Sequence, residues 1–177
     1  GNNRFMKVLE IRRHSIRRAG DHLSQQGVTL ARLVGQNLGP FDRVVTSTLP
    51  RAFETAIAMG FAVDEQNELF NTYGFGVEAE VPWPQPYSRY AEVLKNDGPA
   101  AKYARKLTKA YADLMDFLAE GRSALVINHG GVVELSVAAC LPDVDFTKWG
   151  DSVGYCEGAR LYWNDRFFRA EELRVKM

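Results

Sequence analysis

The sequence predicts an α/β fold in which helices cover both faces of a mostly parallel sheet. Short apolar runs of strand length alternate along the chain with longer segments whose apolar residues recur at helical spacing. Three of these runs end in a set of polar residues directly before a helix begins, which is the arrangement of βαβ units. With 177 residues the chain has the length of one domain, which we expect to span residues 1–177.

In the first half of the chain, two strands are each expected to precede a helix. Residues 6–12 contain a short apolar run that stops at a charged cluster, and apolar residues within 29–38 share one helical face before a Gly-Pro stop. Residues 42–47 predict the second strand. A helix is expected immediately afterwards, because Thr48 can cap it and Pro50 suits its first turn.

A segment at about residues 66–90 is predicted to be an irregular excursion over one face of the domain. It mixes glycines and prolines with many aromatic residues, and such a mixture interrupts regular elements. We expect most of its aromatic side chains to pack against the domain, and one or two to line the entrance to a substrate site.

The second half of the chain supplies the clearest helix and three further strands. The helix is predicted at residues 99–120, where apolar residues lie in helical register before a glycine. The first of the three strands follows at residues 123–128, and the helix after it runs through Ala139. The two closing strands are predicted at residues 159–163 and 167–173.

Composition and charge are ordinary for a soluble globular protein and exclude several classes of partner. The 22 Lys and Arg residues balance 22 Asp and Glu residues, so nothing global favours nucleic acid or an anionic membrane as a partner. No apolar run approaches the roughly 18 residues of a membrane span. Cys140 and Cys156 are interpreted as incidental thiols, which fits a reducing compartment, and we therefore expect a cytoplasmic protein.

Three polar clusters directly follow the ends of predicted strands, within residues 11–15, 45–51 and 127–131. In an open α/β sheet, binding sites form outside the carboxyl ends of the strands. If these three strands are parallel neighbours, their clusters meet in one pocket.

The predicted pocket is rich in arginine and histidine. Arginine forks match phosphate oxygens, and each cluster opens a helix whose free N–H groups favour anions. A neutral imidazole can attack phosphorus in line and form a phosphohistidine that water then hydrolyses. This chemistry requires no metal or other cofactor, and the arginines would repel a zinc ion. The pocket is expected to contain His14, His129, Arg13 and Arg51, with Arg17 or Arg18 close behind.

Four motifs resemble those of the histidine phosphatase superfamily, and they occur in the family order. Arg13-His14 after a strand looks like its Arg-His-Gly signature, and residues 23–27 look like its Leu-Thr/Ser-x-x-Gly element. Residues 47–56 are similar to its Ser-x-Leu-x-Arg-Ala-x-x-Thr-Ala stretch, and residues 128–131 match its second-histidine motif. The four motifs span most of the chain, and together they resemble a phosphoglycerate-mutase-like member of branch 1.

The resemblance implies a three-layer α/β/α fold with a mixed, mainly parallel sheet, in agreement with the pattern of elements. It also implies that His14 is the nucleophile that takes up the phosphoryl group, and that Arg13, Arg51 and His129 form the phosphate-binding core. Further expected phosphate-binding residues are Arg17, Arg18, Ser15 and Gly130.

Two departures from the family pattern affect the predicted site. Ser15 stands where the family has a glycine, so we expect it to narrow the pocket or to offer a hydroxyl to phosphate. Many mutase-like members carry a glutamate as general acid in the middle excursion, but the matching residue here is Asn71, which cannot give a proton. Glu78, Glu80 or Glu68 is the expected substitute. Short phosphohistidine-phosphatase-like members manage without an obvious acid.

The sequence therefore predicts a metal-independent phosphatase, a phosphoric monoester hydrolase that acts on a phosphoester or phosphoramidate through a phosphohistidine on His14. The expected substrate is a phosphorylated small molecule or a phosphoprotein. Two alternatives stay open, a phosphomutase of the phosphoglycerate mutase type and a catalytically weak module that binds phosphorylated ligands. The sequence leaves the oligomeric state open.

Overall fold

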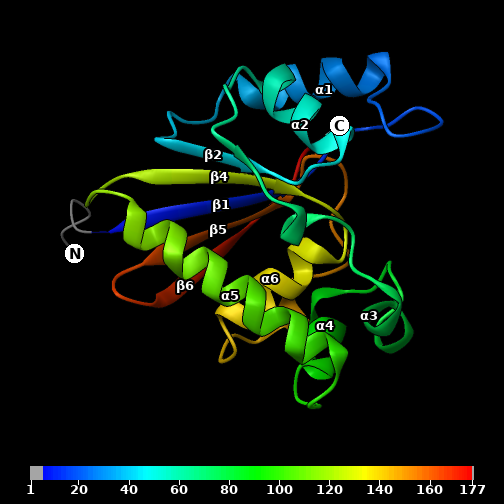
Figure 1. The fold of residues 1–177 in the computed structure, drawn as a ribbon, viewed down its shortest axis with the longest axis vertical. Coiled ribbons are helices and arrows are strands. Elements are labelled where there is room, and N and C mark those ends of the chain that lie inside the picture. The colour runs from blue at the N-terminus through cyan, green and yellow to red at the C-terminus, as the bar shows by residue number, and fades with distance from the viewer. Residues whose placement is uncertain (1–5, 177) are drawn as a thin grey trace.

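A six-stranded sheet lies between two layers of helices in the computed structural model, which describes residues 6–176 (Figure 1). Residues 1–5 and 177 of the expected domain lie outside this range. The order across the sheet is β3-β2-β4-β1-β5-β6. The pairs β1–β4, β4–β2 and β2–β3 are parallel, whereas β5 runs antiparallel to β1 and β6 runs antiparallel to β5. The predicted α/β fold with a mixed, mostly parallel sheet is confirmed. The strands are β1 (Lys7–Arg13), β2 (Arg43–Thr46), β3 (Glu65–Gln66), β4 (Ser123–Asn128), β5 (Gly158–Trp163) and β6 (Phe167–Leu173).

Helices cover both faces of the sheet, as the sequence predicted. Figure 1 shows α1 and α2 together on one face and α4, α5 and α6 on the other. No helix within residues 6–176 is both long enough and apolar enough to span a membrane. The helices are α1 (Gln25–Gly35), α2 (Pro50–Met59), α3 (Phe75–Glu80), α4 (Tyr87–Val93), α5 (Pro99–Phe117) and α6 (Val132–Cys140), with short 3-10 helices η2 (Glu68–Phe70) and η3 (Phe146–Lys148).

Two helices have boundaries that differ from the predicted ones. α1 begins at Gln25, about one turn before its predicted start. The reason is a side-chain cap, because Ser24 Oγ accepts a hydrogen bond from the backbone N–H of Gly27 at 3.0 Å. α5 ends at Phe117, before the predicted residue 120.

Thr48 does not cap α2, which corrects the prediction. The N-cap residue is Leu49, which makes no side-chain capping bond. Thr48 is bound elsewhere, since its backbone N–H and its hydroxyl both donate to Asn71 Oδ1, at 2.9 and 3.1 Å. The cap position therefore connects α2 to the excursion that follows β3.

The excursion at residues 66–90 is more regular than predicted, because it contains η2, α3 and the start of α4. Val77 and Val81 from α3 and its end, and Tyr87 and Tyr90 from α4, are buried in the same core as α5 and α6. Pattern analysis missed these helices because α3 and α4 are only six and seven residues long, too short for a helical period to stand out among glycines and prolines.

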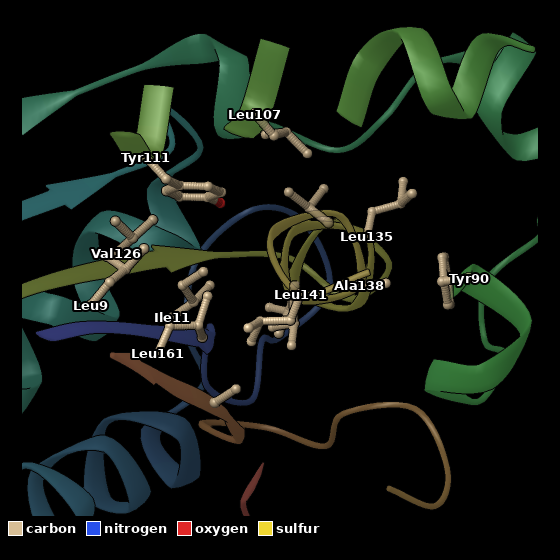
Figure 2. Packing of buried hydrophobic residues seen from close by; sticks show 14 of the residues in the cluster. Leu9, Ile11, Tyr90, Leu107, Tyr111, Val126, Leu135, Ala138, Leu141 and Leu161 are labelled. Carbon is tan, nitrogen blue, oxygen red and sulfur yellow. The ribbon is translucent and has the colours of Figure 1, made fainter. Parts of the chain in front are cut away.

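Two hydrophobic cores hold the layers together, one on each face of the sheet. The larger core lies under α5 and α6, where Figure 2 shows Leu9, Ile11 and Val126 of the sheet beside Leu135 of α6. Each fully buried Leu or Ile contributes about 1.5–3 kcal/mol. α6 is buried from Val132 through Ala138, so this helix runs through the core and can bring a polar side chain there only if that side chain is hydrogen-bonded.

Candidate active site

The carboxyl ends of β1, β4 and β2 meet at one edge of the sheet, as predicted. Arg13 at the end of β1 lies beside Asn128 of β4, and Thr46 at the end of β2 lies beside Ile127. Because these strands are parallel, the chain leaves each of them at the same place. The residues that directly follow are His14, His129 and Ser47.

A cavity of about 330 Å³ opens at this edge. The predicted residues that line it are Arg13, His14, Arg17, Arg51, His129 and Gly130. Thr72, Trp83 and Tyr155 complete the lining, and the sequence analysis singled out none of these three. The topology thus brings the predicted core residues together around one space.

The tautomer of His14 is set by its nearest neighbour. Its Nδ1 lies 2.6 Å from the carbonyl oxygen of Ser15. A carbonyl can only accept, so Nδ1 carries the proton and Nε2 keeps its lone pair. Burial and, to a smaller extent, the charges of Arg13, Arg51 and Arg17 lower the pKa of His14 to about 3, although the hydrogen bond to Ser15 opposes this shift. His14 is therefore a neutral imidazole at pH 7, and the lone pair of its Nε2 is free.

His129 stands beside His14, with 5.2 Å between the ring centroids. Its Nε2 is paired with the hydroxyl of Ser47 at 2.7 Å, so the serine after β2 orients the ring. Burial lowers the pKa of His129 to about 2, and the neighbouring His14 and arginines act in the same direction. His129 is neutral as well, and its Nδ1 is buried without a hydrogen-bond partner within residues 6–176.

Several residues that line this cavity carry buried polar atoms without a hydrogen-bond partner. In the described part of the chain, five buried side-chain polar atoms lack a hydrogen-bond partner, and three of them are Arg13 Nε, Arg51 Nε and His129 Nδ1. A buried donor without a partner costs about 1–3 kcal/mol. The two unpartnered guanidinium donors belong to arginines that line the cavity, and the positive charge of these side chains favours an anion there.

Arg13 is held on several sides. Its guanidinium carbon lies 4.7 Å from the ring centroid of Trp83 and 4.2 Å from that of Tyr155, and its Nη1 donates to the carbonyl of Val153 at 3.3 Å. Such stacking leaves the edge of a guanidinium free for in-plane hydrogen bonds. Arg51 is held by one exposed carboxylate, with its Nη1 3.3 Å from Asp21 Oδ1.

Ser15 does not contact the cavity, which corrects the expectation that it would narrow the pocket or bind phosphate. The residue is fully buried, and its hydroxyl donates to the carbonyl of Gly27 at 2.7 Å. Its backbone N–H donates to the hydroxyl of Thr55 at 2.9 Å. Ser15 and Thr55 together fix the turn that presents His14.

The two arginines after this turn are separated by the structure. Arg17 lines the cavity, whereas Arg18 is exposed and lies outside the lining. Arg18 takes part in a small loop, in which its backbone N–H donates to the carbonyl of His22 at 3.0 Å. His22 itself pairs with Glu54 at 2.6 Å on the surface.

None of the three expected general acids lines the cavity. Glu68 and Glu78 are exposed, and Glu80 accepts from the backbone N–H of Ala100 at 2.7 Å, where it stabilises the start of α5. Asn71 is bound to Thr48, as described above, and its neighbour Thr72 faces the cavity. Within residues 6–176, the cavity lining contains no carboxylate.

The three missed lining residues come from connections, not from strand ends. Trp83 and Thr72 lie in the excursion, for which one or two entrance aromatics were expected without being specified. Tyr155 precedes β5, and it reaches the site because β5 runs antiparallel to β1, so the loop before it arrives at the carboxyl end of β1. The sequence predicted a strand at residues 159–163, but it did not indicate that this strand runs antiparallel to β1.

No metal-binding cluster is found in the described chain, since nowhere in residues 6–176 do three His, Cys, Asp or Glu side chains gather in a way that could hold an ion. Cys140 and Cys156 are both free thiols, as predicted.

The site combines two neutral histidines with an arginine-lined cavity at the carboxyl edge of an α/β sheet. These features define a class of protein. Comparison with known families identifies the class. A sequence model described as the histidine phosphatase superfamily (branch 1) matches residues 11–175. The chain belongs to this superfamily and has its phosphoglycerate-mutase-like fold. No curated protein sequence matches the chain.

Solved structures agree on the fold at low sequence identity. The chain resembles mycobacterial glucosyl-3-phosphoglycerate phosphatase in complex with VO3 with a TM-score of 0.70 at 20% identity, covering 97% of this chain and 99% of that one. It resembles a phosphoglycerate mutase from Bacillus anthracis with a TM-score of 0.70 at 16% identity, covering 97% and 94% of the two chains. It resembles phosphoserine phosphatase from Entamoeba histolytica with a TM-score of 0.68 at 18% identity, covering 96% of this chain and 98% of that one.

Proposed function

We propose that the protein is a phosphatase that hydrolyses a phosphoester or phosphoramidate through a phosphohistidine on His14. One observation carries the proposal, namely that Arg13, Arg51 and His129, each with a buried polar atom that lacks a hydrogen-bond partner, line one cavity with an imidazole whose Nε2 lone pair is free. A trigonal phosphoryl group offers equatorial oxygens to such donors while its phosphorus faces a nucleophile. The substrate we propose is a phosphorylated small molecule or a phosphoprotein.

In the first proposed step, Nε2 of His14 attacks phosphorus, an N–P bond forms, and the bond from phosphorus to the leaving oxygen or nitrogen breaks. The leaving group keeps the bonding electron pair and takes a proton from solvent unless it already carries one. In the second step, water attacks the phosphohistidine, the N–P electron pair returns to Nε2, and the water gives up a proton to solvent. The products are inorganic phosphate and the dephosphorylated substrate.

The leaving group we favour is one that needs little help from an acid. Since no carboxylate lines the cavity within the described residues, an alkoxide would have to depart without a proton from the enzyme, which is slow. A phosphoramidate with a protonated nitrogen, or an ester of an acidic alcohol, avoids that step. Aryl phosphates of increasing leaving-group pKa should therefore show a steep fall in kcat/KM.

The test is an assay of the purified protein with p-nitrophenyl phosphate and a panel of phosphorylated metabolites, with and without EDTA. We expect turnover that EDTA leaves unchanged and that His14→Ala abolishes. His22→Ala is the matched control, because this exposed histidine pairs with Glu54 outside the cavity. Equal loss in both variants, or turnover that survives His14→Ala, contradicts the proposal.

A second candidate is a binding module that holds phosphorylated ligands without turning them over, and the same lack of a lining carboxylate favours it. Such a protein would bind vanadate or phosphate with dependence on Arg51 and yet show no turnover on any panel member. A phosphomutase would instead require priming by a bisphosphate and would accumulate a long-lived phosphoenzyme. Measuring bound vanadate, turnover and phosphoenzyme on one preparation separates the three activities.

A further inference from the structure

Glu134 is a fully buried carboxylate in α6, a helix whose other residues are apolar or small. Its Oε1 accepts from the backbone N–H of Gly131 at 2.9 Å. Its Oε2 accepts from the indole Nε1–H of Trp83 at 3.3 Å and from the backbone N–H of Val153 at 3.4 Å. Burial of a charge in a core is costly, so a carboxylate bound by three separate segments indicates a specific task.

Two of the three residues that Glu134 binds, Trp83 and Val153, also hold Arg13. Trp83 stacks on the Arg13 guanidinium, and the Val153 carbonyl accepts from Arg13 Nη1 at 3.3 Å. Two residues beyond Val153, Tyr155 stacks on the same guanidinium. The carboxylate therefore lies one contact away from a residue that lines the cavity.

Trp83 packs tightly against Gly130, the glycine that follows His129. A Cβ added to Gly130 would lie 2.5 Å from the Trp83 ring, so the indole packs directly on the backbone of that glycine. The indole is thus fixed by three groups, Gly130 beneath it, Arg13 on its face and Glu134 at its Nε1.

We propose that Glu134 is a positioning residue for the anion site, which holds Trp83 and Val153 so that Arg13 is kept in the orientation that meets a phosphoryl group. The inference rests on the proposed function in taking Arg13 as a phosphate ligand. It adds a residue that the family resemblance did not indicate. Glu134 acts through Trp83, Val153 and Arg13 and is not itself part of the cavity lining.

The buried position of Glu134 also predicts that anion binding depends on pH. Burial raises the pKa of Glu134 to about 7, although its backbone and Trp83 hydrogen bonds oppose this rise. The ionisable groups that face it are Arg13 of β1, Tyr73 of the excursion, and Tyr87 and Tyr90 of α4. Burial raises the pKa of these three phenols, so they stay neutral. The ionised carboxylate, present above about pH 7, is the better acceptor for three N–H groups, and anion binding should strengthen as the pH rises through this range.

The experiment compares Glu134→Gln with wild type by two readouts. Isothermal titration with orthovanadate should show roughly tenfold weaker binding in the variant, because one charge-assisted acceptor is lost. In ¹⁵N spectra, the indole N–H signal of Trp83, assigned by its loss in Trp83→Phe, should move with pH in wild type and stay constant in Glu134→Gln. Trp83→Phe keeps the stacking ring but loses the Nε1 donor, so it should weaken vanadate binding less than Glu134→Gln.

Glu157→Gln is the matched control, since Glu157 lies in the same loop but binds Gly154, Val175 and Arg174. It should leave vanadate affinity and the Trp83 signal unchanged. Vanadate binding of wild-type strength in both Glu134→Gln and Trp83→Phe overturns the inference and leaves the proposed function intact. If Glu134→Gln does not fold, Trp83→Phe alone decides by the same affinity criterion. If wild type binds no vanadate, the proposed function itself fails.

Discussion

The two walls of the cavity are built in different ways. The inner wall, made of Arg13, His14, Arg51 and His129, stands at strand ends and in the helix that follows β2. Backbone bonds between neighbouring strands fix it, such as that from the N–H of His14 to the carbonyl of Asn128 at 3.0 Å. The outer wall, made of Thr72, Trp83 and Tyr155, stands on connections and is fixed by side-chain contacts.

Under the proposed function, the two walls have separate tasks. A nucleophile and its anion donors must be held within a fraction of an ångström, and a sheet edge supplies that rigidity. Connections tolerate substitution and insertion without disturbing the sheet. We therefore expect changes in the inner wall to abolish chemistry, and changes in the outer wall to alter affinity and substrate preference.

Removing an inner-wall donor should have the largest effect. Arg51→Ala is expected to lower kcat/KM for p-nitrophenyl phosphate by about 10²–10³-fold, because a buried cationic donor to the transferring oxygens is lost. Arg18→Ala, a change in an exposed arginine outside the lining, should stay within twofold by the same assay. Similar losses in both variants would mean that general positive charge, and not the inner wall, binds the substrate.

The inner wall should also make stability sensitive to acid. His14 and His129 have folded pKa values of about 3 and about 2, below the ordinary value of about 6.5. Between these values the unfolded chain binds protons that the folded chain does not, so stability falls as the pH drops below about 6.5. Each histidine contributes about 2 kcal/mol of this loss between pH 7 and pH 5.

Urea unfolding at pH 7 and pH 5 checks this sign and size. The loss of stability should be smaller by about 2 kcal/mol in His14→Asn than in wild type. His22→Asn, at an exposed histidine outside the cavity, should show the wild-type loss. A His14→Asn variant as acid-sensitive as wild type would show that His14 is not held neutral by burial.

A change at the seam between the walls should have an intermediate effect. Gly130→Ala places a methyl group 2.5 Å from the Trp83 ring, so the indole must move off Arg13, and we expect KM to rise by about tenfold with a smaller change in kcat. Gly74→Ala, where an added Cβ meets nothing within 4 Å, is the control. If kcat falls as steeply as with Arg51→Ala, the two walls are not separable.

The smallest effect is expected at Ser15, which lies behind the inner wall. Ser15→Gly restores the family residue but removes the buried bond to the Gly27 carbonyl, so the free energy of unfolding should fall by about 1–3 kcal/mol. Turnover should stay within twofold, since the hydroxyl faces away from the cavity. Denaturant unfolding and the p-nitrophenyl phosphate assay together test this, and a tenfold change in turnover would place the hydroxyl in the site after all.

The inner wall of the cavity could be predicted from sequence, and the outer wall could not. Apolar strands that end in Arg13-His14 and Asn128-His129 are patterns visible in the local sequence. Parallel pairing of these strands then brings the residues at their ends together. The outer wall depends on the direction of β5 and on packing of the excursion, and no local pattern encodes either. Glu134 did leave a signal, a single carboxylate in an otherwise apolar helix, but the partners that explain it are distant in sequence. The three glutamates expected as general acids do not line the cavity. Sequence alone does not distinguish an exposed glutamate from one in a pocket.

The position of β1 in the sheet has a consequence for biosynthesis. β1 is made before the other five strands of its sheet, yet its two neighbours are β4, which begins at Ser123, and β5, which begins at Gly158. β1 therefore has no strand partner until β4 has been translated, and pairing over such sequence distances is slow. The anion pocket can form only after the segment with Tyr155 has been translated, so chains that end before this residue should be inert toward phosphorylated metabolites, and β1 is the segment that a chaperone would need to shield.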